Sequence, residues 1–443
     1  MHGSRRSPGS TRRSTPARRK QAPALQGHEA HPADICGTAP PTLQFGTPQM
    51  KPGISIQHTA LPTRRYGIVR CDIAGIIGFI QRADWPTDAS AGDFLELTLR
   101  RAQELLDHPL QGLFDRPSRR AVQAFFDNGG DECHLYGVCL ETEEQLLEPD
   151  TVDHVLGPLL ERLRGAEDIS LLAVPSAAYM RCDFTRTGGV SSRADILYRL
   201  LLAHCQQMVN RFLVIDAPRD LHGPAVIAWL ENLKESRGDE LAFGAVYYPW
   251  LKAGEVLMPP SGSVLGVFAR TEREHPPFGV VWPPANTPVL GITHPEVELD
   301  WNESTAMAER GVNPIVVQPG RGVLVFGART LSTEQRWEYI NSRRIVSMIS
   351  EQLRRDNEWV VFEQNSPSMW KVLERDVKAR LDEFWTAGML TGEAAGRDYL
   401  VRCDRETNPK EARDAGQMNV QVRLRPITTT EHITIDLRLG EVV

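Results

Sequence analysis

Residues 196–215 read ILYRLLLAHCQQMVNRFLVI, a stretch that joins a helical pattern directly to a buried strand pattern. Over Ile196–Val209 the apolar side chains recur at spacings of three and four, which predicts an amphipathic helix. The apolar run Phe212–Ile215 follows at once and predicts a strand that is buried on both faces. A helix that leads into such a strand is typical of α/β proteins with a parallel sheet.

The same alternation of strands and helices continues on both sides of this stretch. Upstream, we expect a buried strand in Tyr66–Ile80 and a helix over Phe94–Leu106 with Leu95, Leu99, Ala102 and Leu106 on one face. The middle then predicts, in order, His134–Leu140, Val152–Leu163, Ile169–Val174, the two elements above, the helix Pro224–Ser236 and the strand Ala242–Tyr248. We predict a mainly parallel sheet that is covered on both faces.

A passage rich in Pro and Gly, Met258–Pro295, predicts a loop with short strands, and a different region follows it. There Val323–Phe326 resembles a strand and Thr333–Arg355 a long helix. Ser366 and Pro367 supply an N-cap and a first-turn proline for another helix, which Gly388 ends. One apolar face of that helix carries Trp370, Leu373, Val377, Leu381 and Phe384. A polar loop over Cys403–Gln417 follows this helix. With its separate helices and strands, the region is predicted to be α+β.

Strictly alternating apolar and polar residues mark both ends of the folded part. The alternating apolar positions are Val420, Val422 and Leu424, then Ile433, Ile435, Leu437 and Leu439. These runs predict amphipathic strands of an antiparallel sheet with one wet face. Near the other end, Ile54 and Ile56 alternate with polar residues in the same way.

Residues 1–49 are rich in Ser, Arg, Pro, Gly and Ala, which predicts a disordered tail. An arm that binds an anionic surface and a translation start at Met50 remain alternatives. We therefore divide the chain into a tail (1–49), a strand arm (50–66), an α/β middle domain (67–310) and a C-terminal domain (311–443) that ends in a second strand arm.

Composition excludes several classes of protein. The chain has 443 residues, of which 41% are hydrophobic and 24% charged, as in ordinary globular proteins of two or three domains. Its net charge is −7, and the basic residues of the first 20 positions leave the remainder more acidic, which argues against general binding to nucleic acid. Seven scattered cysteines predict reduced thiols. No apolar run is long enough for a membrane span, and no secretory signal is recognisable.

No catalytic or cofactor-binding pattern rises above background. Gly320-Arg321-Gly322 precedes a strand instead of opening a helix, which is the wrong order for a phosphate loop. The spacing of Cys133, His134 and Cys139 matches no zinc pattern. Pro260–Ser263 contains no GxSxG and predicts a turn. We therefore expect no catalytic residue, no metal and no cofactor, and assembly becomes the more attractive function.

The C-terminal region carries a resemblance. Its motifs are Gly311-Val312-Asn313, Gly320-Arg321-Gly322, Phe326–Ser332, Trp337, Tyr339-Ile340-Asn341, Arg343-Arg344, Val361-Phe362-Glu363, Asn365, Trp385, Cys403-Asp404 and Thr407-Asn408. In this order and spacing they resemble the tail sheath proteins of contractile phages and phage-like injection systems. Upstream segments such as Asn128-Gly129-Gly130 and Tyr247–Trp250 extend the resemblance to about Lys51, and residues 1–49 match nothing in it.

The resemblance implies a structural subunit without enzymatic activity. Sheath subunits polymerise as stacked hexameric rings around an inner tube and shorten to drive the tube through a target envelope. Their implied fold is α/β, often compared to subtilisin in topology, with an α+β C-terminal domain. Implied partners are further copies of the chain, the tube protein, and baseplate and cap proteins, with no nucleic acid and no membrane insertion. Assembly would occur in the bacterial cytoplasm, before incorporation into a phage tail or a tail-like particle that can be released.

The resemblance also gives the end strands a role, because sheath subunits exchange terminal strands with their neighbours. Ile54, Ile56, Ile433, Ile435 and Leu437 are the candidate contacts of the arms, and the strand with Val420, Val422 and Leu424 is the candidate acceptor. Lys371, Arg375 and Lys378 are candidate tube-facing residues. Closure of the strands within one subunit, and ordinary solvated surface for the cations, are the alternatives. A minor sheath paralogue near the baseplate or cap, and a soluble α/β hydrolase, remain alternatives for the whole chain.

Overall fold

The computed structural model describes residues 67–85, 90–146, 148–186, 188–235, 238–392 and 398–429, and every structural statement below concerns these residues. Three predictions lie outside the described residues: the tail at 1–49, the strand arm at 50–66 with Ile54 and Ile56, and the final strand with Ile433, Ile435 and Leu437.

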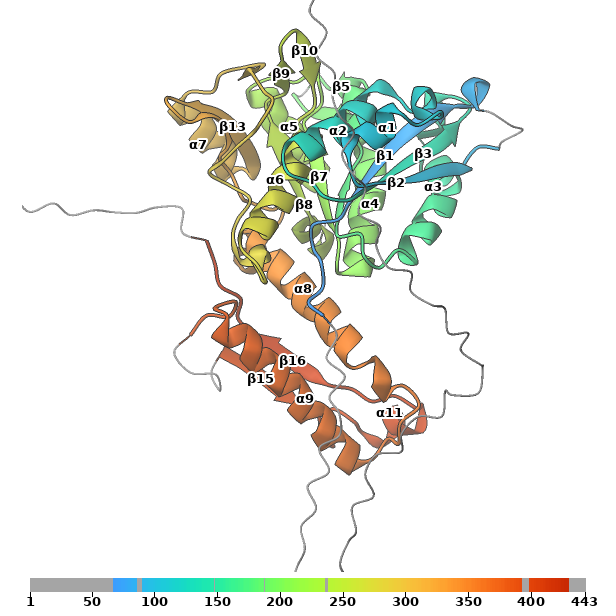
Figure 1. The fold of residues 1–443 in the computed structure, drawn as a ribbon, viewed down its shortest axis with the longest axis vertical. Helices are drawn as coiled ribbons and strands as arrows, with labels where there is room; N and C mark the ends of the chain where they lie inside the picture. Colours follow the sequence, from blue (N-terminus) through green and yellow to red (C-terminus); the bar gives the residue numbers. More distant parts are fainter. Residues whose placement is uncertain are drawn as a thin grey trace, which may run out of the picture. The chain divides into compact units, whose positions relative to one another are not determined.

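A nine-stranded sheet forms the centre of the α/β part (Figure 1). Its order is β11-β14-β13-β8-β7-β4-β1-β3-β2. The six strands from β13 to β3 are parallel, and antiparallel strands flank them at both ends. The strands are β1 (Ala74–Gln81), β2 (Phe94–Leu99), β3 (Cys133–Leu140), β4 (Leu171–Ala173), β7 (Phe212–Asp216), β8 (Gly244–Tyr248), β11 (Thr287–Pro288), β13 (Val312–Gln318) and β14 (Gly322–Val325). Because β1 lies between β3 and β4, the order follows the doubly wound pattern of flavodoxin-like sheets.

Helices cover both faces of this sheet, as the sequence predicts. Alternate residues of β7 show the two faces: Leu213 and Ile215 pack into one core, and Phe212 and Val214 pack into the other. The first core is closed by α3 (Pro149–Arg164), α4 (Asp195–Met208), α5 (Pro224–Lys234) and α7 (Trp301–Glu309), and the second mainly by α1 (Ala102–Leu106), α2 (Arg116–Asp127) and α6 (Ser261–Glu274). The mixed α/β class is therefore confirmed.

The helix predicted over Phe94–Leu106 is wrong for most of its length. Phe94–Leu99 forms the edge strand β2, which pairs antiparallel with β3, and only Ala102–Leu106 is helical. The alternation in FLELTL is the strand signal, because Leu95, Leu97 and Leu99 all pack on the same core. Leu106, which was expected on the buried face, is 51% exposed.

The loop predicted over Met258–Pro295 is also wrong at its start, because Ser261–Glu274 forms the buried helix α6. Its glycines permit close packing against α2. A Cβ at Gly262 would lie 2.5 Å from the Cα of Ala121, and one at Gly266 would lie 2.4 Å from the carbonyl oxygen of Phe125. Glycine here serves helix–helix contact and does not interrupt the helix. The predicted turn at Pro260–Ser263 is the beginning of α6.

Beyond the sheet, a third core is built around α8 (Ile340–Asp356) and α9 (Pro367–Thr386). The helix predicted from Thr333 begins only at Ile340. Before it, the N–H of Thr330 donates to the carbonyl of Glu338, and the N–H of Ile340 donates to the carbonyl of Ala328. The predicted cap of α9 is confirmed, since Ser366 accepts the N–H of Met369 and all five residues of the predicted apolar face are buried. The polar loop contains the short helix α11 (Lys410–Asp414).

Short strands form three further sheets, in the pairs β5–β6 and β15–β16 and the triple β10-β9-β12. Their bounds are β5 (Cys182–Phe184), β6 (Val190–Ser192), β9 (Leu251–Ala253), β10 (Val256–Met258), β12 (His294–Pro295), β15 (Tyr399–Arg402) and β16 (Gln421–Leu424). Strands β13 and β14 belong to the nine-stranded sheet, so that sheet continues past the domain boundary predicted at residues 310/311. Among the described residues no helix is long and apolar enough to cross a bilayer.

A buried carboxylate joins β7 to the start of α6. Asp216, the last residue of β7, is 1% exposed and accepts the N–H of Ser261 at 2.6 Å. Burial raises the pKa of Asp216 to about 7, although the hydrogen bond from the N–H of Ser261 opposes this shift. The folded state therefore binds a proton more tightly than the unfolded state, and stability is lost as the pH rises from about 4 to about 7.

We expect Asp216→Asn to remove this loss. The gain in the free energy of unfolding of the variant over the wild type should grow with pH, by about 2–4 kcal/mol in total between pH 4 and pH 8. Urea unfolding at several pH values measures it. Ser263→Ala, which alters a neighbouring buried hydroxyl but no ionisable group, should keep the wild-type slope. Equal slopes for wild type and Asp216→Asn would contradict the prediction.

Candidate interaction surface

Helix α8 links the α/β part to the third core (Figure 1). Ile340, at its beginning, packs with residues of the sheet, whereas Ile345, Met348 and Ile349 pack with α9. Polar side chains of α8 are buried as well, and the set includes Asn341, Ser342, Arg343, Arg344, Glu351 and Gln352. A helix that is buried almost all round needs a partner for each of these groups.

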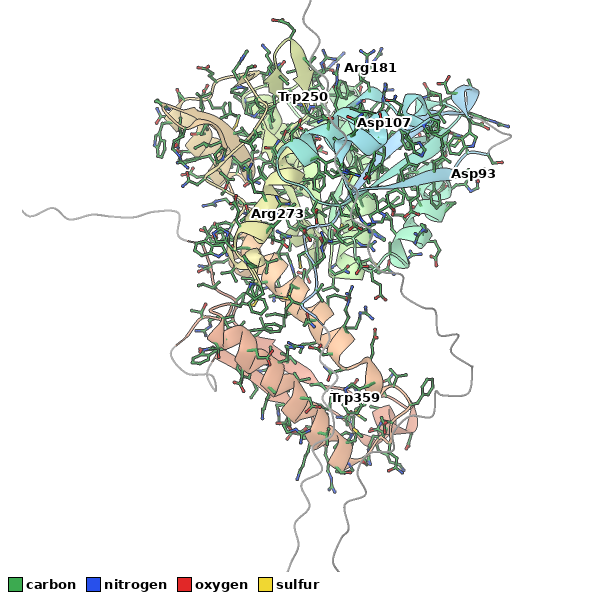
Figure 2. The ribbon with its side chains drawn as sticks, viewed as in Figure 1. Asp93, Asp107, Arg181, Trp250, Arg273 and Trp359 are labelled. Carbon is green, nitrogen blue, oxygen red and sulfur yellow. The ribbon has the colours of Figure 1, made fainter. Side chains whose placement is uncertain are left out.

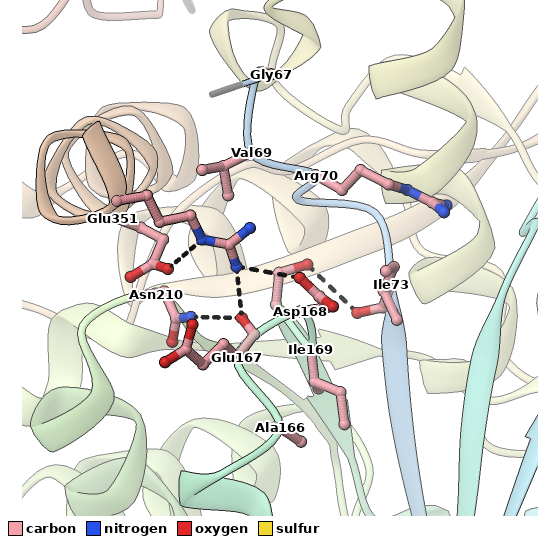
Figure 3. Close-up of polar contacts among 12 residues, drawn as sticks. Gly67, Val69, Arg70, Ile73, Ala166, Glu167, Asp168, Ile169, Asn210 and Glu351 are labelled. Carbon is pink, nitrogen blue, oxygen red and sulfur yellow. Dashed lines mark hydrogen bonds and ion pairs between the residues drawn. The ribbon is translucent and has the colours of Figure 1, made fainter. Parts of the chain in front are cut away.

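One set of partners is the segment 67–73, which leads into β1. Val69 and Cys71 are buried in the third core, so this N-terminal segment completes the core of the C-terminal helices. Gln352 holds the backbone of the segment: its Oε1 accepts the N–H of Val69 at 2.8 Å, and its Nε2 donates to the carbonyl of Gly67 at 3.3 Å. Figure 3 shows Gly67, Val69 and Ile73 along this path.

The end of α8 carries an ion-pair network at the same place (Figure 3). Glu351 pairs with Arg354 at 2.8 Å and with Arg355 at 2.7 Å, and Arg355 reaches Asp168 at 3.1 Å. Burial opposes ionisation of Glu351, but the hydrogen bonds from both arginines hold its pKa below the usual value. The network therefore joins the end of α8 to the loop before β4. Asp168 and its neighbours also line an open cavity of about 560 Å³.

Two arginines fasten the first half of α8. Arg344 forms a buried ion pair with Glu272 of α6 and donates to the carbonyl of Cys71 at 2.6 Å. The guanidinium of Arg343 lies 4.5 Å from the ring centroid of Phe243 and 4.1 Å from that of Trp337. Burial lowers the pKa of Arg343 to about 10, which leaves it charged at neutral pH. Both distances lie within the range of favourable cation–π interactions, and burial of the guanidinium strengthens such interactions.

The last described residues also end on α8. Ser342 donates its hydroxyl to the carbonyl of Ile427 at 3.1 Å, and Thr429 donates to Asn341 at 2.8 Å. The N–H of Ile427 donates to the carbonyl of Met389 at 3.0 Å, just after α9. Both described ends of the chain therefore contact the same helix, one near its end and one at its beginning.

The candidate acceptor strand lies beside these contacts. Val420, Val422 and Leu424 are half-buried against the third core, and Gln421 and Arg423 between them are exposed. The alternation predicted for this run is therefore confirmed, and β16 pairs with β15 in antiparallel register. In the part of the chain that the structure describes, the sheet has only these two strands, so each has one edge without a strand partner.

The three candidate tube-facing cations lie on the exposed side of α9. Lys371, Arg375 and Lys378 are all exposed. Lys378 pairs with Glu374 at 2.6 Å, and Arg375 pairs with its neighbour Asp376 at 3.0 Å. This side of α9 therefore presents a mixed pattern of charges in place of a uniformly basic stripe.

Side chains of the types that a hydrolase uses are present, but they are not arranged as a catalytic site. Ligands of doubly wound enzymes bind at the carboxyl ends of strands near the switch in strand order. Asp115 lies there, and its oxygens accept from Phe79 N at 2.6 Å and from Ser176 Oγ at 2.7 Å. The hydroxyl of Ser261 is buried and has no hydrogen-bond partner, so no base is bound to it, and the nearby carboxyl of Asp216 is occupied by the N–H of Ser261. His204 bonds instead to Arg211, and burial beside that cation lowers its pKa to about 3.

In the described residues, the Cys and Gly motifs considered for metal and phosphate binding have structural roles. No group of three or more His, Cys, Asp and Glu side chains there could hold a metal ion. Cys133 and Cys139 are buried and free. Gly320 has a φ value of +77° and lies in the turn between β13 and β14, and Gly322, with a φ value of +86°, begins β14 opposite Gln318. Positive φ, and not phosphate binding, explains these glycines.

Sequence reasoning did not identify the polar groups on α8. Arg343 and Arg344 stand in the motifs of the resemblance, but nothing in their pattern indicated that they are buried. Gln352 gave no signal, because an isolated Gln in a helix usually lies on the surface. The buried strand predicted over Tyr66–Ile80 did indicate that Val69, Cys71 and Ile73 are buried, although the strand β1 begins only at Ala74.

Comparison with known proteins adds the family. Residues 189–331 match the family model described as the phage tail sheath protein central domain, and residues 332–440 match the phage tail sheath C-terminal domain. The tail sheath protein of Vibrio phage KVP40 is 21% identical over 180 residues, which cover 40% of this chain and 26% of that protein. A putative prophage major tail sheath protein of Pseudomonas aeruginosa is 22% identical over 230 residues, which cover 51% of this chain and 57% of that protein. The matches thus span a quarter and just over half of these relatives.

Solved structures share the fold. The sheath complex of an extracellular contractile injection system in its contracted state matches with a TM-score of 0.65 at 23% identity, covering 89% of this chain and 98% of that one. The contracted helical sheath of the anti-feeding prophage matches with a TM-score of 0.62 at 24% identity, covering 87% and 98%. The two family matches are contiguous and together exceed half of the chain. The chain therefore belongs to the phage tail sheath protein family.

Proposed function

We propose that the chain is a structural subunit of a contractile sheath. Copies assemble as stacked hexameric rings around an inner tube, and the sleeve shortens to drive the tube through a target envelope. Membership of the family supports this proposal. The observation that carries it is the two-stranded sheet β15–β16, which is packed on the third core beside both described ends of the chain.

Linkage between subunits occurs by strand exchange. A two-stranded sheet is weak alone, and its edges offer unpaired N–H and C=O groups. The arm with Ile54 and Ile56 and the arm with Ile433, Ile435 and Leu437 come from neighbouring copies and extend the β15–β16 sheet. Each isoleucine that is buried in this way stabilises the contact by about 1.5–3 kcal/mol. Several anchors on two arms outweigh the entropy lost when the arms are ordered.

Contraction then needs no chemical step by the subunit. Strand pairs keep the copies connected while the α/β bodies rotate and slide as rigid units. The driving free energy is the difference in surface buried between bodies in the extended and contracted sleeves. The occupied Asp115 and the unactivated Ser261 support a non-enzymatic role. The sleeve is made in the bacterial cytoplasm, contacts tube, baseplate and cap proteins, and becomes part of a phage tail or tail-like particle.

Replacing Ile433 and Ile435 with Asp, or deleting residues 432–443, should abolish sleeves and leave a folded subunit. The charges prevent burial of the arm in a neighbour, and the free energy of unfolding of the isolated subunit should change by less than about 0.5 kcal/mol. Electron microscopy and urea unfolding measure the two effects. The matched control replaces His432 and Thr434, on the other face of the same strand, with Asp and should still assemble. Normal sleeves from the Ile433 and Ile435 variant would refute strand exchange.

The outer side of α9 is the proposed tube contact. Lys371→Glu combined with Arg375→Glu should weaken binding of the purified tube protein by about threefold to tenfold at low salt, and by less at high salt, because exposed charges are screened. Co-sedimentation over a range of salt concentrations measures this. Arg116→Glu with Arg181→Glu changes the same charge on the α/β part and should leave binding unchanged (Figure 2 shows Arg181). Equal binding by both double variants would place the tube elsewhere.

A further inference from the structure

Both described ends of the chain are held by one buried helix. Gln352 contacts the first described residues, and Asn341 contacts the last. These two positions are eleven residues apart on α8, which corresponds to roughly 16 Å along the helix axis. Because a helix is stiff over such a length, the distance between the two exits is fixed by α8 and not by the loops around it.

The side chain of Gln352 is 0% exposed and makes directional contacts with the leaving backbone. Its acceptor and donor bind Val69 and Gly67 in the manner of one rung of a sheet. Val69 and Cys71 are also buried, but burial of apolar side chains has no direction. The two hydrogen bonds therefore define the path on which the chain arrives at Gly67.

The amide of Gln352 is itself held in place from α9. Its Nε2 also donates to Asp356 at 3.0 Å, and the other carboxylate oxygen of Asp356 accepts from Arg380 at 2.5 Å. Arg380 is 8% exposed and belongs to α9. A continuous, largely buried chain of hydrogen bonds thus runs from α9 through Asp356 and Gln352 to the backbone of the N-terminal segment.

We propose that Gln352 is a positioning residue for assembly. It fixes the place and direction in which the N-terminal strand arm leaves the subunit, and α8 holds this exit at a set distance from the C-terminal exit near Asn341. The two arms are thereby presented to neighbouring copies with a constant separation. This inference rests on the strand exchange of the proposed function.

Gln352→Met tests it in the full-length chain, since Met fills the same space without hydrogen bonds. In the isolated subunit, hydrogen exchange at the Val69 amide should become at least tenfold faster, while the amides of β1 and β3 keep their wild-type rates. Sleeve formation should then require at least tenfold more subunit.

Controls separate this inference from the function on which it rests. Ile349→Val trims a buried apolar residue of the same helix and removes no hydrogen bond to either exit, so it should assemble as the wild type does. If Gln352→Met frees the Val69 amide and still forms regular sleeves at wild-type concentration, the inference is wrong and strand exchange stands. If Gln352→Met fails to fold, Val69→Pro deletes the same hydrogen bond from the other side, and normal sleeves from that variant overturn the inference equally. Absence of sleeves from the wild type would refute the proposed function itself.

Discussion

Polar side chains of α8 lie in the interior, and each requires a partner there, because an unpaired buried polar group destabilises a fold by about 1–3 kcal/mol. The partners come from four directions: Glu272 on α6, Asp356 within α8 itself, the backbone of the segment before β1, and the backbone after β16. This requirement places the α/β part, the third core and both chain ends at one helix. Residues distant in the sequence thus form a single junction whose polar groups depend on one another.

A junction of this kind determines which parts of a sheath subunit can move. Directional hydrogen bonds and the buried pair Arg344–Glu272 resist sliding of α8 against its neighbours, because separation would leave a charge unpaired in the interior. Exposed ion pairs such as Arg354–Glu167 resist much less, since they are screened by solvent. In the proposed sleeve, motion is therefore expected between subunits, with each subunit turning as a unit.

The parallel sheet and the helix α9 could be predicted from the sequence because their signals are local. The run Phe212–Ile215 and the apolar face of α9 each reflect burial within one element. Helix α6 could not be predicted, because its glycines serve a close approach to α2 that only the tertiary structure provides. The strand β2 was hidden by leucines that fit both periods over a short stretch. Gln352 was invisible for a similar reason: its partners lie about 280 residues away in the sequence. The subtilisin-like topology stays a prediction.

The unfinished β15–β16 sheet poses a competition that the exits must resolve. An arm that leaves beside its own sheet can close that sheet, and a tethered strand has an effective concentration in the millimolar range. The arm pairs with a neighbour's sheet only if closing the sheet of its own subunit is energetically unfavourable. A flexible exit would lower the free-energy cost of closing the sheet within the same subunit, because a free hinge can adopt the required turn. In the proposed exchange, an exit that Gln352 holds against a stiff helix has less of this freedom, which favours pairing with a neighbouring copy over closure within the same subunit.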